Sequence, residues 1–107
     1  MLQYYNMTKL LKVIKSTKKG KKWTAIFKKD NGKEKSVHFG YDNPKDKTND
    51  YTLHKDKTRR ERYRKRHIKD LKTGDAMRAG YLSFYLLWGN STSLKTNITN
   101  YKKKFNL

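Results

Sequence analysis

The stretch KWTAIFKKDNGKEKSVHF, residues 22–39, decides the fold that this sequence predicts. Its first half places Trp23, Ala25 and Phe27 on one face, with the two-residue period of a half-buried strand. Asp30–Asn31–Gly32 is then the strongest hairpin signal in the chain, because Asn and Gly tolerate the positive φ angles that tight hairpin turns need. In the second half apolar side chains again alternate with polar ones. The stretch is therefore predicted to be an antiparallel hairpin with one apolar face.

One more strand precedes this hairpin, and a loop follows it. Residues 9–15 (KLLKVIK) contain the β-branched pair Val13–Ile14 and lead into a turn at residues 17–20. The result is a three-stranded antiparallel β-meander over residues 9–40, whose apolar face must be covered. Residues 41–54 include the single proline and are predicted to be a loop.

Three helices are predicted over residues 55–107. The first, residues 55–72, begins near Asp56 or Thr58, either of which suits an N-cap, and stops at Gly74. The second, residues 75–88, is apolar nearly all round, as expected of a helix buried against the sheet. The third follows a Ser-Thr-Ser cap and carries an apolar stripe at helical spacing, made of Leu94, Ile98, Tyr101 and Phe105.

These elements define a single small α+β domain, residues 9–107, with an N-terminal arm over residues 1–8. The chain has 107 residues and no cysteine, so disulfides and thiolate metal sites are excluded. Its longest apolar run, residues 81–88, is too short to span a bilayer. A glycine-rich phosphate loop and a dinucleotide fingerprint are both lacking, so we expect no small-molecule substrate and no cofactor.

The charge of the chain predicts an acidic partner. There are 28 Lys and Arg against 9 Asp and Glu, a formal net charge of +19. Residues 55–72 alone hold ten basic and three acidic residues, and on a helix the basic residues form a row along one face. The alternative is a solvated helix whose charges only keep the chain soluble. We predict contact with nucleic acid or an acidic protein face through Lys55, Arg59, Arg62, Arg66 and Lys69.

Aromatic residues near both ends of the chain are candidates for protein contact. Tyr4 and Tyr5 belong to the predicted arm, and Tyr101 and Phe105 belong to the last predicted helix. Aromatic side chains bring a large contact area to an interface. We expect the arm and the last helix to contact a partner protein.

His38, His54, Asp56 and His67 are the candidate metal ligands, and they are the residue types of a metal-dependent nuclease. On a helix, His67 would lie about 20 Å from His54, at about 1.5 Å per residue. His67 also shares a stripe with Tyr63, where a packed histidine is the ordinary outcome. We therefore predict no metal site and no catalytic residues.

A series of short motifs runs along residues 10–107. They are Val37–Gly40, Asp50–Asp56, Arg59, Tyr63–His67, Gly80–Ser83, Leu87–Trp88, Thr92–Leu94 and Tyr101–Phe105. In this order they resemble a family of small basic proteins encoded by giant nucleocytoplasmic DNA viruses of algae and amoebae. The resemblance implies a large DNA virus and its particle as the setting, and it implies no enzymatic activity. The polar loop at residues 42–49 is longer than the Gly-rich connection usual in that family.

Charge and resemblance together predict a non-enzymatic virion protein. It would be a minor capsid or structural component that contacts acidic capsid proteins or the genome. The alternative is a double-stranded DNA-binding protein for genome packaging or transcription, and a metal-dependent nuclease is a third hypothesis. We expect the protein in the virion, and otherwise in the host cytoplasm, at the viral factory, or in the nucleus.

Overall fold

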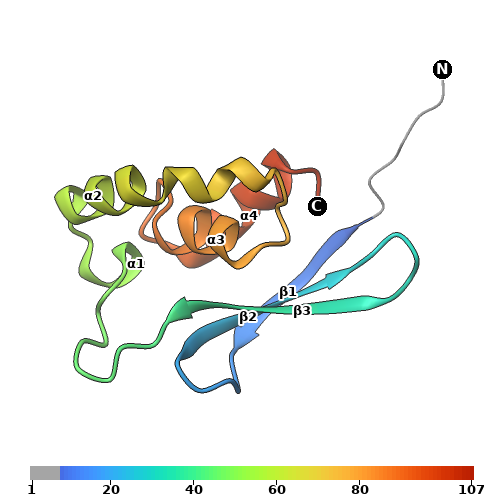
Figure 1. Cartoon of the computed structure of the whole chain (residues 1–107), viewed down its shortest axis with the longest axis horizontal. Helices are drawn as coiled ribbons and strands as arrows, with labels where there is room; N and C mark the ends of the chain where they lie inside the picture. Colours follow the sequence, from blue (N-terminus) through green and yellow to red (C-terminus); the bar gives the residue numbers. More distant parts are fainter. Residues whose placement is uncertain (1–7) are drawn as a thin grey trace.

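The computed structural model describes residues 8–107 and confirms a small α+β domain with one antiparallel sheet followed by helices. The helices lie on one side of the sheet, and the hairpin between strands β2 and β3 projects beyond them (Figure 1). The predicted N-terminal arm, with Tyr4 and Tyr5, lies outside the described residues apart from residue 8.

The sheet is the predicted meander. Its strands pair antiparallel in the order β1-β2-β3, so that Ala25 in the central strand lies opposite Val13 on one side and Val37 on the other. A register shift interrupts the pairing of the first two strands near Leu10. The strands are β1 (Lys9–Lys15), β2 (Lys21–Lys28) and β3 (Glu34–Tyr41).

The inner face of the sheet packs against the C-terminal part of the chain. Phe27 and Phe39 are fully buried and belong to one apolar cluster with Leu82, Leu86 and Tyr101. Removing apolar surface from water stabilises a fold by about 25 cal/mol per Å². The helical segments therefore supply the cover that a three-stranded sheet needs.

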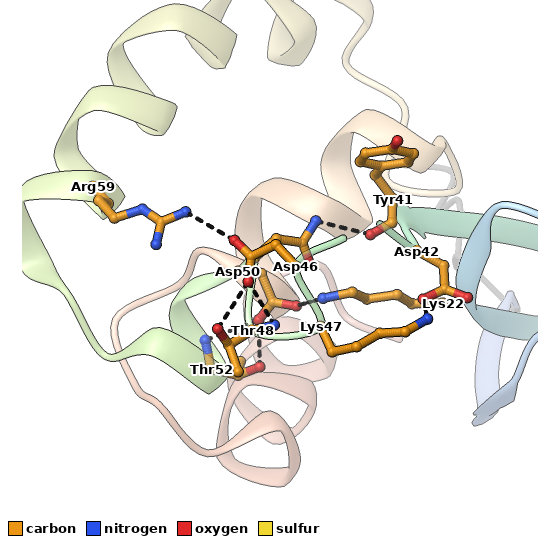
Figure 2. A network of polar contacts seen from close by, with 10 residues as sticks. Lys22, Tyr41, Asp42, Asp46, Lys47, Thr48, Asp50, Thr52 and Arg59 are labelled. Carbon is orange, nitrogen blue, oxygen red and sulfur yellow. Dashed lines mark hydrogen bonds and ion pairs between the residues drawn. The ribbon is translucent and has the colours of Figure 1, made fainter. Parts of the chain in front are cut away.

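The prediction of a loop over residues 41–54 is wrong at its end, where the one-turn helix α1 (Tyr51–His54) forms. Asp50 caps this helix, because its carboxylate accepts hydrogen bonds from the backbone N–H and the hydroxyl of Thr52. The same carboxylate forms a buried ion pair with Lys22 of β2 (Figure 2). This helix depends on a contact with a distant strand, which no local sequence pattern reveals.

The basic helix is α2 (Lys57–His67), and its N-cap is Asp56, the first of the two predicted starts. The carboxylate of Asp56 accepts hydrogen bonds from two backbone N–H groups of the first turn. The helix does not continue to residue 72, because beyond α2 the chain tightens into the 3₁₀ segment η1 (Ile68–Thr73). Gly74 ends this segment with a φ of +66°, which confirms the predicted stop.

The second predicted helix, residues 75–88, is shorter and less regular than expected. Its first four residues form a turn, in which the carboxylate of Asp75 accepts a hydrogen bond from the backbone N–H of Met77 at 2.9 Å. The helix proper comprises α3 (Ala79–Leu82) and the π-helical turn η2 (Ser83–Leu87). Its burial against the sheet agrees with the prediction.

Gly89 allows the chain to turn sharply after η2. A Cβ atom at this position would lie 2.2 Å from the carbonyl oxygen of Tyr85, a distance that real Cβ contacts do not show. Only glycine therefore lets the backbone fold back this closely on the preceding turn.

The last helix, α4 (Leu94–Lys104), matches the third predicted helix. The hydroxyl of Ser93 caps it by accepting a hydrogen bond from the backbone N–H of Thr96 at 3.1 Å. The side-chain amide of Asn97 donates to the carbonyl oxygen of Leu86 at 3.0 Å and ties α4 to η2. None of the helices within residues 8–107 has the length and apolar character that crossing a membrane demands.

Replacing Asp50 by Asn should destabilise the fold strongly. The side chains of Asp50 and Lys22 are only 4% and 11% exposed, so the variant leaves the lysine charge unpaired where water is largely excluded. Breaking a buried ion pair in this way costs about 3–5 kcal/mol. An asparagine can still cap α1, so the loss reports the ion pair, and urea unfolding followed by tryptophan fluorescence measures it.

Asp42→Asn is the matched control. The Asp42 and Lys47 side chains of the neighbouring ion pair are 43% and 67% exposed. An exposed pair contributes about 0–1 kcal/mol, so this variant should unfold at nearly the same urea concentration as the parent protein. Equal losses of stability in the two variants would contradict the assigned role of the buried pair.

Candidate polyanion interface

A column of aromatic rings attaches α2 to the rest of the domain. The ring of Tyr63 stacks on Trp88 with centroids 4.2 Å apart and planes 4° apart. The ring of His67 also stacks on Tyr63 at 4.2 Å, and His54 of α1 packs against Trp88 at 5.2 Å. Each such ring pair contributes about 0.5–1.5 kcal/mol beyond its buried area. No residue of α2 is fully buried, so this column is the main apolar attachment of the helix.

Two arginines of α2 bind the end of η2. Arg64 Nη1 donates to the carbonyl oxygen of Trp88 at 2.8 Å, and Arg60 Nη1 donates to that of Gly89 at 3.4 Å. The guanidinium of Arg64 also lies over the ring of Phe84, 4.2 Å from its centroid. Cations suit the carbonyl-rich end of a helical segment. Sequence reasoning missed both residues, because a charge pattern alone does not separate an inward arginine from an outward one.

The predicted polyanion-binding residues face outward. The arginines among them share one stripe of α2, and Arg59 forms a long ion pair of 3.8 Å with Asp46 (Figure 2). In the described part of the chain, no ion pair involves the other four residues, which are Lys55, Arg62, Arg66 and Lys69. The exposed side chains are Lys55, Arg59, Arg62, Arg66 and Lys69, and we call them the cationic row.

A cleft of about 410 Å³ lies beside the cationic row, between α2 and the ends of β2 and β3. Lys21 and Arg66 line it and bring positive charge to it. Two carboxylates also line it: Asp50 is paired with Lys22, and Oδ2 of Asp70 lies 3.0 Å from Nδ1 of His67. The cleft therefore extends the cationic surface from α2 towards the sheet.

Burial shifts the pKa values of two residues in the ring column, and at His54 the positive charge of Arg59 adds to the shift. Burial raises the pKa of the Tyr63 hydroxyl to about 12, so this group stays protonated at neutral pH. Burial, followed by the positive charge of Arg59, lowers the pKa of His54 below its ordinary value. Nδ1 of His54 accepts a hydrogen bond from the backbone N–H of Asp56 at 2.9 Å, which places the proton of the neutral ring on Nε2.

The candidate metal ligands do not come together. Within residues 8–107, no three His, Asp or Glu side chains are grouped so that they could hold a metal ion. His54 and His67 lie at opposite ends of the ring column, separated by two other rings. His38 is on the sheet, where the hydroxyls of Ser16 and Thr24 each lie 2.8 Å from its Nδ1. The arrangement offers no centre for metal-dependent hydrolysis by the predicted residues.

The predicted protein contacts on α4 need correction. Tyr101 is 1% exposed and its hydroxyl donates to the carbonyl oxygen of Ala76, while burial raises the pKa of this hydroxyl above its ordinary value. Phe105 is half-buried and packs edge-on against Tyr81 and Tyr85, with centroids 5.6 and 5.3 Å away. The apolar stripe of α4 packs into the core, so Tyr101 has no surface to offer a partner.

Fold and charge together define the class of protein: a small basic α+β domain with one cationic helix on its surface. A family model matches residues 11–67, more than half of the chain, and the chain therefore belongs to the DUF5754 family, a family of unknown function. The matched residues run from β1 to the end of α2 and include all of the cationic row except Lys69. No curated protein and no solved structure matches the chain.

Replacing Arg59 by Gln should raise the pKa of His54. The arginine charge disfavours protonation of the ring, so removing it moves the pKa back towards the ordinary value of a histidine. Following the His54 Cε1–H resonance by NMR across a pH titration measures the change.

Arg62→Gln is the matched control, because it removes the same charge from the same helix and Arg62 is not among the groups that shift the His54 pKa. We expect this variant to leave the His54 titration unchanged. The assignment fails if the two variants move the pKa equally.

Proposed function

We propose that this protein is a non-enzymatic DNA-binding component of a large DNA virus, and that the cationic row contacts the phosphate backbone of double-stranded DNA. The observation that carries the proposal is the exposure of the five cations of the cationic row, which within residues 8–107 form only one ion pair, the long one at Arg59. Cations held close together repel one another, and a polyanion relieves that repulsion.

The geometry of α2 suits a phosphate backbone. Arg59, Arg62 and Arg66 lie on one stripe that spans about 10 Å, at about 1.5 Å of helix rise per residue. Duplex DNA carries one negative charge per about 1.7 Å of its axis, so several phosphates face a row of this length. Such contacts position a protein on DNA without reading bases, and we propose binding without sequence specificity.

The viral setting rests on the motif resemblance alone. In that setting the protein would be packaged in the virion, and otherwise it would reside in the host cytoplasm, at the viral factory, or in the nucleus. A cationic surface of this kind would neutralise genome phosphates during packaging.

A second candidate is a minor structural protein that docks on an acidic capsid protein. Leu11 and Ile14 favour it, because they are 45% and 43% exposed on β1 among several lysines. Apolar side chains within a charged surface are typical of a protein interface. Such docking would depend on these side chains and less steeply on salt than DNA binding does.

Combining Arg62→Gln, Arg66→Gln and Lys69→Gln should weaken DNA binding and flatten its salt dependence. Each phosphate that is no longer neutralised reduces the slope of log K against log salt by about 0.9, so we expect the slope to fall by about 2 to 3. Fluorescence anisotropy with a random-sequence duplex between about 50 and 200 mM salt measures both quantities.

The matched control combines Lys28→Gln, Lys33→Gln and Lys103→Gln, which removes the same charge from exposed positions on β2, the hairpin turn and α4. It should change the slope by much less. Equal effects of the two triple variants would mean that DNA responds only to net charge. Weak binding of the parent protein, unchanged by the α2 variant, would favour the capsid candidate.

A further inference from the structure

We propose that a second, smaller pocket binds a single phosphate group. The pocket has a volume of about 250 Å³ and lies between α2, the turn after η2, and α4. No residue of the cationic row lines this pocket. The site therefore goes beyond the proposed function and is tested separately from it. Its polar lining comprises Arg64, Tyr85, Asn90, Asn97, Asn100 and Lys104.

The charged side chains that line this pocket have one sign. Arg64 comes from α2 and Lys104 from α4, and no carboxylate is among the described residues that line the pocket. Arg64 and Lys104 therefore present positive charge to the pocket from two separate elements, and no acid of the lining offsets it. A bound oxyanion would offset the positive charge of both side chains.

Arg64 is already held in place for such a ligand. One of its N–H groups is used on the carbonyl oxygen of Trp88, and its guanidinium rests on the ring of Phe84. A guanidinium has five N–H donors, so others remain for a ligand in the pocket. Burial, followed by the nearby charge of Arg60, lowers the pKa of Arg64, and an anion in the pocket would favour the charged form of this side chain. Because packing fixes the side chain, little conformational entropy is lost on binding.

The other side of the pocket supplies further donors. Lys104 Nζ lies 5.9 Å from the centroid of the Tyr85 ring, and no ion pair engages it within residues 8–107. The exposed amides of Asn90 and Asn100 stand at the rim. The amide of Asn97 is committed to the backbone carbonyl oxygens of Leu86 and Ser91, so it shapes the wall.

The size and chemistry of the pocket select the ligand class. Pockets for drug-sized molecules measure about 300–1,000 Å³, so about 250 Å³ suits one phosphate group with its water. Guanidinium and ammonium donors form charge-assisted hydrogen bonds with phosphate oxygens, which are about twice as strong as neutral ones. The phosphate could be free or could be the terminal phosphate of a nucleic acid strand, since both present the same oxygens.

The test is a titration of the ¹⁵N-labelled full chain with inorganic phosphate, with ionic strength held constant by sodium chloride. We expect saturable shifts at the side-chain amides of Asn90 and Asn100 and at Nε of Arg64. Lys104→Gln should weaken the phosphate affinity about tenfold, because it removes a charge-assisted hydrogen bond to the phosphate. Arg64→Lys keeps the charge but removes the planar fork, and it should also weaken binding.

Lys103→Gln is the matched control, because it removes the same charge from an exposed neighbouring position of α4. Should Arg64→Lys not fold, Lys104→Gln still decides the matter, because the Lys104 side chain is exposed. Shifts spread over the lysine-rich surface, or equal effects of Lys103→Gln and Lys104→Gln, would overturn the proposal.

A second arm of the same titration separates the two sources of phosphate. A short oligonucleotide with a 5′ phosphate is compared with the same oligonucleotide lacking it. Shifts at Asn90 and Asn100 that require the 5′ phosphate would support the site and assign it to a strand end. Shifts with inorganic phosphate alone would support the site and assign it to free phosphate.

Discussion

The stack between Tyr63 and Trp88 is the interaction on which the position of α2, and so of the cationic row, depends. α2 is rich in cations and buries none of its residues fully, so little hydrophobic burial holds it to a domain that already carries a net charge of +19. The ring column provides that attachment, because its stacked planes bring apolar faces together. Without this stack, charge repulsion would favour a detached helix.

The arginines of α2 divide into two groups with different physical roles. Arg60 and Arg64 point towards the end of η2 and donate to backbone carbonyl groups there. Arg62 and Arg66 point outward and keep their donors for a partner. The inward pair orients the helix, and this orientation decides which face the outward pair presents. The attachment of α2 and its proposed binding of DNA therefore depend on residues of one type.

The sheet and the last helix follow from local sequence, whereas the middle of the chain does not. The alternation at Trp23, Ala25 and Phe27 and the turn at Asn31–Gly32 predict the meander correctly, because strand period and turn chemistry are local properties. The helix α1 and the late start of α3 were not predictable in this way. Asp50 depends on Lys22 for its position, and a tertiary contact of that kind leaves no short-range pattern.

Only the outward-facing residues of the candidate site were predictable from the sequence. Helical periodicity places the outward row correctly, since a stripe of cations needs no partner to be recognised. The inward roles of Arg60 and Arg64 depend on the carbonyl groups after η2, and the burial of Tyr101 depends on the sheet that α4 covers. Periodicity marks an apolar stripe but does not say whether it packs into the core or against a partner.

The most direct measurement of the central claim is NMR detection of the arginine Nε–Hε resonances while a duplex DNA is added to the folded protein. We expect the resonances of Arg59, Arg62 and Arg66 to shift or broaden first, while those of Arg60 stay nearly constant because its guanidinium faces the domain. Perturbation confined to the backbone amides of the sheet, with the outward arginines unchanged, would contradict the claim that α2 is the binding surface.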